Sequence, residues 1–246
     1  MVEPLMSAER TILSGPHPLW IVGLVTVLFA SLARTMRGVS VSGAVAGGIV
    51  CFVLYASVGI SGFIMLVLLF ILTWAATRLG YQRKQRLGAA EKKEGRTASQ
   101  VFANVGAASA CAAAYWWHGN TLFLLAMCAA LAEAAADTVS SEIGQAYGSE
   151  ARLITNLQKV PAGTNGGVTI IGTLVGVGAA ILMTLAGIFS GVVHRHDWLT
   201  SIIAPVIGMI SDSYLGATLE RRGFLSNNVV NFFGTLTAIF VAMILR

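Results

Sequence analysis

Residues 38–77 read GVSVSGAVAGGIVCFVLYASVGISGFIMLVLLFILTWAAT and contain no charged side chain. A helix that crosses the hydrocarbon core of a bilayer needs about 20 apolar residues, so this stretch is long enough for two spans. Ser57, Gly59, Ser61 and Gly62 lie in its middle and favour a turn between them. The stretch therefore predicts two membrane helices joined by a short hairpin.

The composition of the whole chain extends this interpretation. Hydrophobic residues make up 56% of the 246 positions and charged residues only 11%, against about a quarter charged in a soluble domain. Apolar runs bounded by charged or turn residues predict helices at about 19–33, 39–57, 61–77, 98–117, 121–139, 168–190, 201–219 and 229–245. The expected fold is an all-α, polytopic bundle of about eight transmembrane helices. This composition excludes a soluble enzyme and leaves no room for a soluble nucleotide-binding domain.

The short first helix is expected to be retained in the mature protein. It ends in Ser31-Leu32-Ala33, which superficially resembles a signal-peptidase site. The segment before it is long and carries Glu3 and Glu9, whereas a signal peptide opens with a basic cluster.

The basic segment 78–97 divides the chain into two parts of one membrane domain. Residues 1–97 hold three expected helices and this segment, and residues 98–246 hold the other five. If the basic segment faces the cytoplasm, that side receives 13 of the 16 Lys and Arg residues. They are Arg34, Arg37, Arg78, Arg83, Lys84, Arg86, Lys92, Lys93, Arg96, Arg152, Lys159, Arg221 and Arg222.

Arg10, Arg195 and Arg246 remain on the other side, where both chain termini are expected. Cytoplasmic loops of membrane proteins are enriched in Lys and Arg, and anionic lipids attract such loops. The formal charge of +5 therefore reflects membrane orientation, and nucleic-acid binding is not indicated. The basic segment is expected to be a solvated linker, with attraction of an anionic substrate as the alternative.

Acidic side chains in the fifth helix are the first chemical signal. An ionised Asp at the centre of a bilayer helix costs about 2.5–3.5 kcal/mol, so an embedded acid needs a reason. Glu133 and Asp137 are four residues apart, hence on one helix face, with Ser141 and Glu142 following. All four are candidate site residues, although acids near the membrane interface can also be solvated or cap a loop.

A second set of acids lies in the seventh helix. Asp212 is inside the helix and Glu220 is at its cytoplasmic boundary. The fifth and seventh helices run in the same direction, so both acid sets are expected at the same membrane face. Converging carboxylates suit Mg²⁺, which takes one or two carboxylates together with phosphate oxygens and water. The expected ligands are Asp137 and Asp212, with Glu133 or Glu142 as further candidates.

The loop 155–168, TNLQKVPAGTNGGV, leads directly into the sixth helix. Glycines let backbone N–H groups approach an anion, and a helix N-terminus adds free donors and the positive end of its dipole. Lys159 is expected to neutralise phosphate charge. The other candidate phosphate-binding residues are Asn156, Gly163, Thr164, Asn165, Gly166 and Gly167. The loop does not have the residue order of a Walker A motif, and a plain tight turn would use the same residues.

Three further amides lie at the same expected level. Asn104 is early in the fourth helix, and Asn228 and Asn231 are at the start of the eighth. They are candidates for a shared pocket, although Asn also forms structural hydrogen bonds between membrane helices. Gly43-x3-Gly47 and Gly172-x3-Gly176 are expected to be faces for close helix packing.

The remaining polar groups are expected to carry no chemistry. The His194–Trp198 run falls on the opposite side of the membrane and is expected to be a wet loop with an interfacial Trp. The three cysteines lack CxxC spacing and indicate neither a zinc site nor a disulfide framework.

Three segments resemble an integral-membrane family, the one that contains transmembrane protein 19 and the phytyl-phosphate kinase of plants and cyanobacteria. They are DTVSSEIG at 137–144, KVPAGTNGGVT at 159–169 and DSYLGATLE at 212–220. The resemblance covers nearly the whole chain. It implies transfer of a phosphoryl group from a nucleoside triphosphate, CTP, to an isoprenyl monophosphate, which yields the diphosphate. This chemistry fits the Mg²⁺ site expected from the carboxylates, a site that the Lys and Arg distribution predicts to face the cytoplasm.

Two other functions use similar residues. A cytidylyltransferase that makes a CDP-activated lipid would need the same metal and phosphate sites but would release pyrophosphate. An ion-coupled transporter would use embedded acids near the bilayer midplane and symmetric repeats. The sequence does not decide the length of the isoprenoid tail, the nucleotide base or the oligomeric state.

Overall fold

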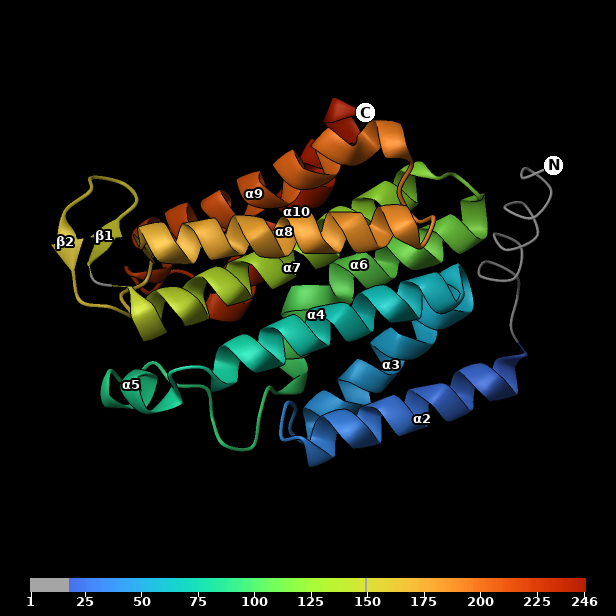
Figure 1. Cartoon of the computed structure of the whole chain (residues 1–246), viewed down its shortest axis with the longest axis horizontal. Coiled ribbons are helices and arrows are strands. Elements are labelled where there is room, and N and C mark those ends of the chain that lie inside the picture. Colours follow the sequence, from blue (N-terminus) through green and yellow to red (C-terminus); the bar gives the residue numbers. More distant parts are fainter. Residues whose placement is uncertain (1–17, 149) are drawn as a thin grey trace.

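The helices of this computed structural model follow the apolar runs of the sequence (Figure 1). The structure describes residues 18–148 and 150–246, so the expectations for Glu3, Glu9, Arg10 and the position of the N-terminus lie outside the described residues. Eight of the described helices are long: α2 (Leu19–Thr35), α3 (Val41–Val58), α4 (Ile60–Arg78), α6 (Ala98–His118), α7 (Leu122–Tyr147), α8 (Ile170–Phe189), α9 (Trp198–Leu215) and α10 (Asn227–Leu245). Between them lie the short helix α5 (Tyr81–Arg86), a 3₁₀ turn η1 (Arg195–Asp197) and a π-helical turn η2 (Gly216–Glu220).

The protein is an all-α, polytopic membrane bundle. Six of the described segments are long and apolar enough to span a bilayer: α3, α4, α7, α8, α10 and the segment 195–220 that contains α9. The apolar helix α2 has 17 residues and falls short of this length. α6 has 21 residues, but Ser, Gln and Asn side chains lower its hydropathy. The count of eight spans therefore stays a prediction.

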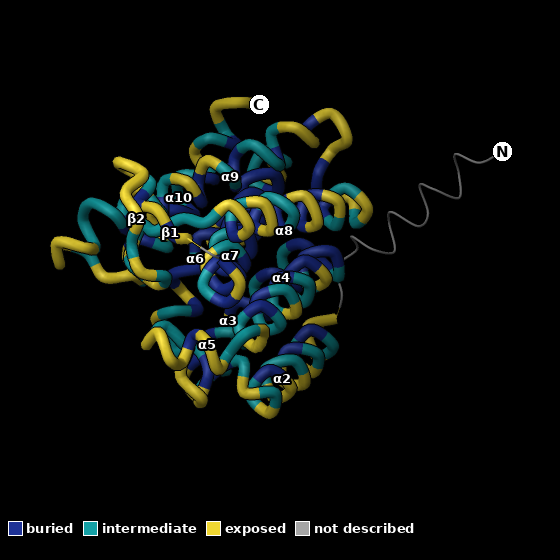
Figure 2. The backbone as a smooth tube through the Cα atoms, turned by 60° about the vertical axis from the view of Figure 1, so that its left-hand side comes forward, coloured by how far each residue is buried: buried dark blue, intermediate teal, exposed yellow. Residues whose placement is uncertain are grey.

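Helix α7 lies at the centre of the bundle. The apolar part of α7 is 83% buried, against 28–39% for the other five candidate spans. Its inner residues are mostly alanines, which allow neighbouring helices to approach closely. Figure 2 shows that buried residues gather around α7 and that exposed residues lie on the outer helices. Apolar side chains that face outward, such as Ile170 and Phe189, suit contact with lipid.

Glycines set the contact between α7 and α8. A Cβ added to Gly172 would lie 2.6 Å from the carbonyl oxygen of Ser140, and one added to Gly176 would lie 2.9 Å from that of Ala136. The Gly172-x3-Gly176 spacing therefore packs two helices closely. Gly43 also lies tightly, against the backbone of Arg96, but an added Cβ at Gly47 would meet nothing within 4 Å. The packing interpretation of Gly47 is wrong, because this glycine faces open space.

Two stretches differ from the predicted helix bounds. Helix α7 continues to Tyr147, eight residues beyond the expected 121–139, because its polar last turns face a cavity inside the bundle. Part of the glycine-rich loop forms a small antiparallel sheet in the order β2-β1-β3, with β1 at Ala151–Leu153, β2 at Lys159–Val160 and β3 at Gly167–Val168. Arg152 pairs with Lys159 on one side and with Val168 on the other. The sheet fixes both ends of the glycine turn.

One end of the bundle gathers α5, the small sheet and the polar helix ends, at the left of Figure 1. We call this the site end. At the opposite end, Arg246 forms an ion pair with Asp197 (3.7 Å) and the imidazole rings of His194 and His196 stack. The two ends therefore differ in charge and structure, as a bundle with one polar site would require.

We predict that loops 78–97, 140–167 and 220–228 face the cytoplasm, because they carry most of the cations. Single cysteines at 94, 150 and 195 test this in a cysteine-free background, since the native Cys51, Cys111 and Cys128 are buried. A membrane-impermeant maleimide should label position 195 from outside and positions 94 and 150 only after permeabilisation. Labelling of 150 and 195 from the same side would contradict this topology.

Candidate active site

A polar cavity of about 390 Å³ lies at the site end, between α6, α7, α9 and α10 and the loops that precede α6 and α8. We call it the polar cavity. Of the sixteen residues predicted for the site, twelve line it. They are Asn104, Asp137, Ser141, Glu142, Gly163, Thr164, Asn165, Gly166, Gly167, Asp212, Glu220 and Asn231. The fold thus brings together residues that are more than a hundred positions apart in the chain.

Two carboxyl groups from different helices face each other in the polar cavity. Asp137 on α7 and Asp212 on α9 both line the cavity and interact electrostatically with one another. Asp212 is 9% exposed, and its Oδ2 atom is buried without a hydrogen-bond partner. Two adjacent carboxylates repel each other unless a proton or a cation lies between them. This arrangement provides a site for positive charge.

Glu133 continues the acidic face of α7 one turn deeper in the bundle. It is 1% exposed, does not line the polar cavity, and interacts electrostatically with both Asp137 and Asp212. Gly208 and Gly234 make room for it, because an added Cβ would lie 2.6 Å from Cγ of Glu133 at Gly208 and 2.5 Å from its Oε1 atom at Gly234. That Oε1 atom has no hydrogen-bond partner. The acids therefore extend from the cavity wall into the centre of the bundle.

The carboxylates do not form a complete metal cage. Among residues 18–148 and 150–246, no three His, Cys, Asp or Glu side chains come together as a group that could hold a metal ion. Asp137 and Asp212 together offer carboxylate oxygens, which suit a hard cation. A cation held here needs additional ligands from a bound molecule or from water.

Amide side chains connect α6 and α10 on another wall. Nδ2 of Asn231 donates to Oδ1 of Asn104 over 3.4 Å, and Nδ2 of Asn104 donates to the carbonyl oxygen of Gln100 over 2.8 Å. Oδ1 of Asn231 is buried without a partner. Asn228 does not line the cavity, whereas its neighbour Asn227 does. The amides thus hold the helix ends together and leave one acceptor for a ligand or water.

The glycine turn rests on the π-helical turn that follows Asp212. Gly163 and Gly166 have φ angles of 87° and 73°, a left-handed conformation that favours glycine. The backbone N–H of Gly167 donates to the carbonyl oxygen of Thr164 over 2.8 Å. An added Cβ at Gly166 would overlap Ala217 of η2, so only glycine permits this approach. The turn is therefore fixed beside the two aspartates.

Glu142 is paired with Lys84, a contact that the sequence pattern does not predict. Its Oε2 atom accepts a hydrogen bond from Nζ of Lys84, and its Oε1 atom accepts one from Oγ1 of Thr77 over 3.0 Å. Lys84 is completely buried and also donates to the carbonyl oxygens of Ala76 (3.0 Å) and Thr77 (2.8 Å). Lys84 already neutralises the Glu142 carboxylate, which makes this residue a poor candidate for a metal ligand.

Two loop residues predicted for phosphate binding lie outside the polar cavity. Lys159 is exposed in β2, and its Nζ atom donates to Oε1 of Glu150 over 2.7 Å. This contact holds the pKa of Glu150 below its usual value. Asn156 uses its side-chain oxygen to accept from the backbone N–H of Gln158 (3.1 Å). The expectation that Lys159 points into the phosphate site is therefore not met, because strand pairing turns it to the surface.

A second cavity of about 560 Å³ adjoins the polar cavity and lies between α2, α3, α4 and α6. We call it the apolar cavity. The two cavities share lining residues at their junction: Glu91, Lys92, Arg96, Gln100 and Asn104. Nη2 of Arg96 lies 3.4 Å from Oγ1 of Thr138, and its charge interacts with Asp137. Of this group, only Asn104 is predicted from the sequence as a site residue, because the cations are part of a basic run that membrane topology alone explains.

Comparisons with known proteins agree with the membrane architecture. A family model described as "Integral membrane protein DUF92" matches residues 24–239. "Protein VTE6, chloroplastic" of Arabidopsis thaliana is 30% identical over 257 aligned residues, which cover 100% of this chain and 77% of that protein. An uncharacterized membrane protein of Synechocystis is 33% identical over 78% of this chain and 76% of its own length.

A third organism also has a relative that aligns with most of this chain. An uncharacterized membrane protein of Methanocaldococcus jannaschii is 31% identical over 87% of this chain and 88% of its own length. No solved structure matches the chain. The family model covers most of the described helices and every residue that lines the polar cavity. The chain therefore belongs to the DUF92 family of integral membrane proteins.

Proposed function

We propose that the protein is a lipid-phosphate kinase, which transfers the terminal phosphoryl group of CTP to an isoprenyl monophosphate and forms the diphosphate. The resemblance of the three motif segments supplies the donor and the isoprenoid. The two adjoining cavities support a reaction between a polar, highly charged substrate and an apolar one. The reaction would take place at the junction where Arg96 lies.

The observation that carries the proposal is the meeting of Asp137 and Asp212 beside the glycine turn. One oxygen of this pair is buried without a partner, and all its donor atoms are oxygens. Mg²⁺ typically takes one or two carboxylates together with phosphate oxygens and water. A pair without a third carboxylate therefore fits a Mg²⁺ ion that arrives on a nucleotide.

In the proposed mechanism the protein positions charges and does little covalent work. Bound Mg²⁺ would neutralise charge on the transferring phosphoryl group. Asp137 and Asp212 would hold it from two helices, and backbone N–H groups of the turn 163–167 would orient the nucleotide phosphates. Arg96 would neutralise the acceptor phosphate next to Asp137.

The proposed reaction does not require a general base. An oxygen of the ionised acceptor phosphate forms a bond to the terminal phosphorus of CTP, while the bond from that phosphorus to the bridging oxygen breaks. The electron pair of the broken bond leaves with CDP. Because the acceptor oxygen is already ionised, no proton must be removed. No histidine is among the described residues that line the polar cavity, and this mechanism needs none.

The test is product analysis with purified protein in nanodiscs, Mg²⁺, a panel of nucleoside triphosphates and phytyl or geranylgeranyl monophosphate. The expected products are the isoprenyl diphosphate and CDP, identified by mass spectrometry. A CDP-linked lipid with pyrophosphate would instead indicate a cytidylyltransferase. No turnover of any nucleotide with any of these lipids would contradict both enzyme functions and favour a transporter.

The placement of Lys159 leads to a prediction for this assay. Lys159→Ala should leave the KM for CTP within about twofold of the wild-type value, because this side chain is exposed and paired with Glu150. Asn165→Ala, in the turn that lines the polar cavity, should raise that KM by about tenfold through loss of a hydrogen bond to phosphate. Steady-state kinetics of the two variants provide the comparison. An equal increase in the KM for CTP in both variants would show that Lys159 contributes to nucleotide binding as much as Asn165 does.

A further inference from the structure

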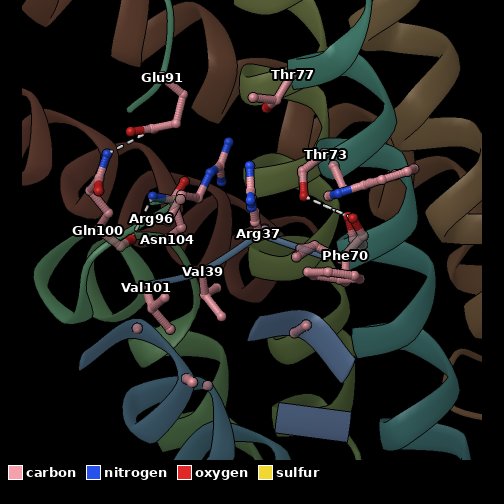
Figure 3. Close-up of a pocket in the computed structure, with 18 of the residues that line it drawn as sticks. Arg37, Val39, Phe70, Thr73, Thr77, Glu91, Arg96, Gln100, Val101 and Asn104 are labelled. Atoms are coloured by element: carbon pink, nitrogen blue, oxygen red, sulfur yellow. Dashed lines mark hydrogen bonds between the residues drawn. The ribbon is translucent and has the colours of Figure 1, made fainter. Parts of the chain in front are cut away.

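The side chains that line the apolar cavity change from apolar on one side to charged and polar on the other. Figure 3 shows Val39, Val101 and Phe70 on one side and Glu91 and Thr77 on the other. Arg37 and Arg96 lie between these groups, with their guanidinium nitrogens toward Glu91 and Thr77. Deeper lining residues are apolar, among them Phe29, Val50, Leu66 and Leu69. The cavity therefore combines an apolar interior with a charged mouth.

Charge at the mouth is strongly positive. Five cationic side chains line the cavity, against the single carboxylate of Glu91. They are Arg37, Arg78, Lys92, Lys93 and Arg96. Arg78 is engaged by the carbonyl oxygen of Met36 (2.6 Å) and the ring of Trp74. None of the other four forms an ion pair with the described parts of the chain, 18–148 and 150–246.

The backbone supports a functional role for Arg37. Its φ angle is 53°, in the left-handed region that costs a side-chain-bearing residue about 1 kcal/mol or more. This conformation is held by the turn between α2 and α3, where the backbone N–H of Gly38 donates to the carbonyl oxygen of Ala33 over 3.0 Å. The turn thereby places the exposed Arg37 side chain at the cavity mouth.

We infer that the apolar cavity is the binding site of the acceptor lipid, a single-chain isoprenyl monophosphate. Its phosphate would lie between Arg37 and Arg96, and its tail would lie along α2, α3 and α4. Arginine forms paired hydrogen bonds with phosphate oxygens, and the apolar interior suits a hydrocarbon tail. This inference rests on the proposed kinase function and gives it the location of the second substrate.

The size and continuity of the cavity favour one occupant. A volume of about 560 Å³ falls within the range of small-molecule sites, about 300–1,000 Å³. Arg96 belongs to the junction shared with the polar cavity, so a phosphate held there would lie next to Asp137. A lipid with one phosphate head group at the mouth and one tail inside fits both the volume of the cavity and the position of Arg96. A two-chain phospholipid is the competing occupant that the experiment must exclude.

Gly47 gives a way to alter the interior of the cavity. It lines the wall one helical turn deeper than Gly43, and a Cβ added there meets nothing within 4 Å. A leucine at this position would therefore add side-chain volume at the cavity wall, and its Cβ atom would meet no other group. Gly178 on α8 is a matched control, because an added Cβ there also meets nothing within 4 Å and it lines neither cavity.

The first test compares isoprenyl monophosphates of different tail lengths in the kinase assay. Gly47→Leu should lower kcat/KM for geranylgeranyl monophosphate by about tenfold and leave the value for dimethylallyl monophosphate within about twofold. Gly178→Leu should change neither value. Arg37→Gln should raise the KM for both lipids by about tenfold, whereas Arg86→Gln, exposed and outside both cavities, should leave it unchanged. Equal loss with both tail lengths in Gly47→Leu would overturn the inference.

The second test detects binding without catalysis. Wild-type protein in nanodiscs is irradiated with geranylgeranyl monophosphate that carries a diazirine at the tail end, and the labelled peptides are identified. Labels on α2, α3 or α4 support the inference even if no nucleotide is turned over, a result that would overturn only the kinase proposal. Labels confined to α8, α9 or α10 overturn the inference. Displacement of the probe by an equal amount of dioleoyl phosphatidate would also overturn the choice of a single-chain lipid.

Discussion

Asp137→Asn and Asp212→Asn should each lower nucleotide turnover by more than about a hundredfold, since loss of even an indirect contact to a metal site typically costs about 10–100-fold. Each change replaces one of the two facing carboxylates by an amide, which is a much weaker ligand for a hard cation. The measurement is the initial rate of CDP release over a range of Mg²⁺ concentrations.

Stability separates this loss of activity from misfolding. Asn has nearly the same shape as Asp, and the change removes one of two adjacent negative charges. The melting temperature of either variant without nucleotide should therefore be equal to that of the wild type or higher. Glu94→Gln, an exposed carboxylate outside both cavities, is the control and should change neither property. Near-normal turnover by either aspartate variant at modest Mg²⁺ would remove that residue from the metal site.

The buried ion pair between Lys84 and Glu142 is expected to stabilise the fold. Lys84→Met should lower the free energy of unfolding by about 3–5 kcal/mol, because it leaves the Glu142 carboxylate without its buried partner. Lys84 also donates to two carbonyl oxygens at the end of α4, so its loss leaves several acceptors without a donor. Thermal unfolding in detergent measures the change.

A double variant distinguishes the ion pair from simple packing. Lys84→Met combined with Glu142→Gln should recover most of the lost stability, because no unpaired charge remains. Arg86→Met removes an exposed cation from the same short helix and should leave the melting temperature nearly unchanged. If Lys84→Met melts like the wild type, or the double variant like the single one, the pair does not stabilise the fold as the structure indicates.

Hydrophobic pattern alone predicted much of the fold. Charged and turn residues interrupt the apolar runs near most of the places where the long helices begin and end, and all eight predicted helices are present. The error at α7 has a physical cause, since Asp, Ser and Glu usually indicate an exposed helix end. Here these residues face a cavity within the bundle, and the helix continues. The small sheet was missed because strands of two or three residues have too little pattern to recognise.

Polar groups within apolar helices can be recognised in the sequence, and two of them, Asp137 and Asp212, line the same cavity in the structure. Prediction failed within the basic run, where Lys84 and Arg96 look like their neighbours. Only the tertiary structure turns Lys84 toward Glu142 and Arg96 toward Thr138. The environment of Gly47 could not be predicted either. A glycine that packs against another helix and a glycine that lines a cavity can have the same spacing in the sequence.

The fate of each phosphorus atom of CTP distinguishes a kinase from a cytidylyltransferase. The protein is incubated in nanodiscs with Mg²⁺ and geranylgeranyl monophosphate, and with CTP that carries radioactive phosphorus in either the terminal or the innermost position. Transfer of a phosphoryl group predicts that the lipid product gains label only from the terminal position, while the innermost label stays in CDP. Label that reaches the lipid from the innermost position, with release of pyrophosphate, would contradict the account.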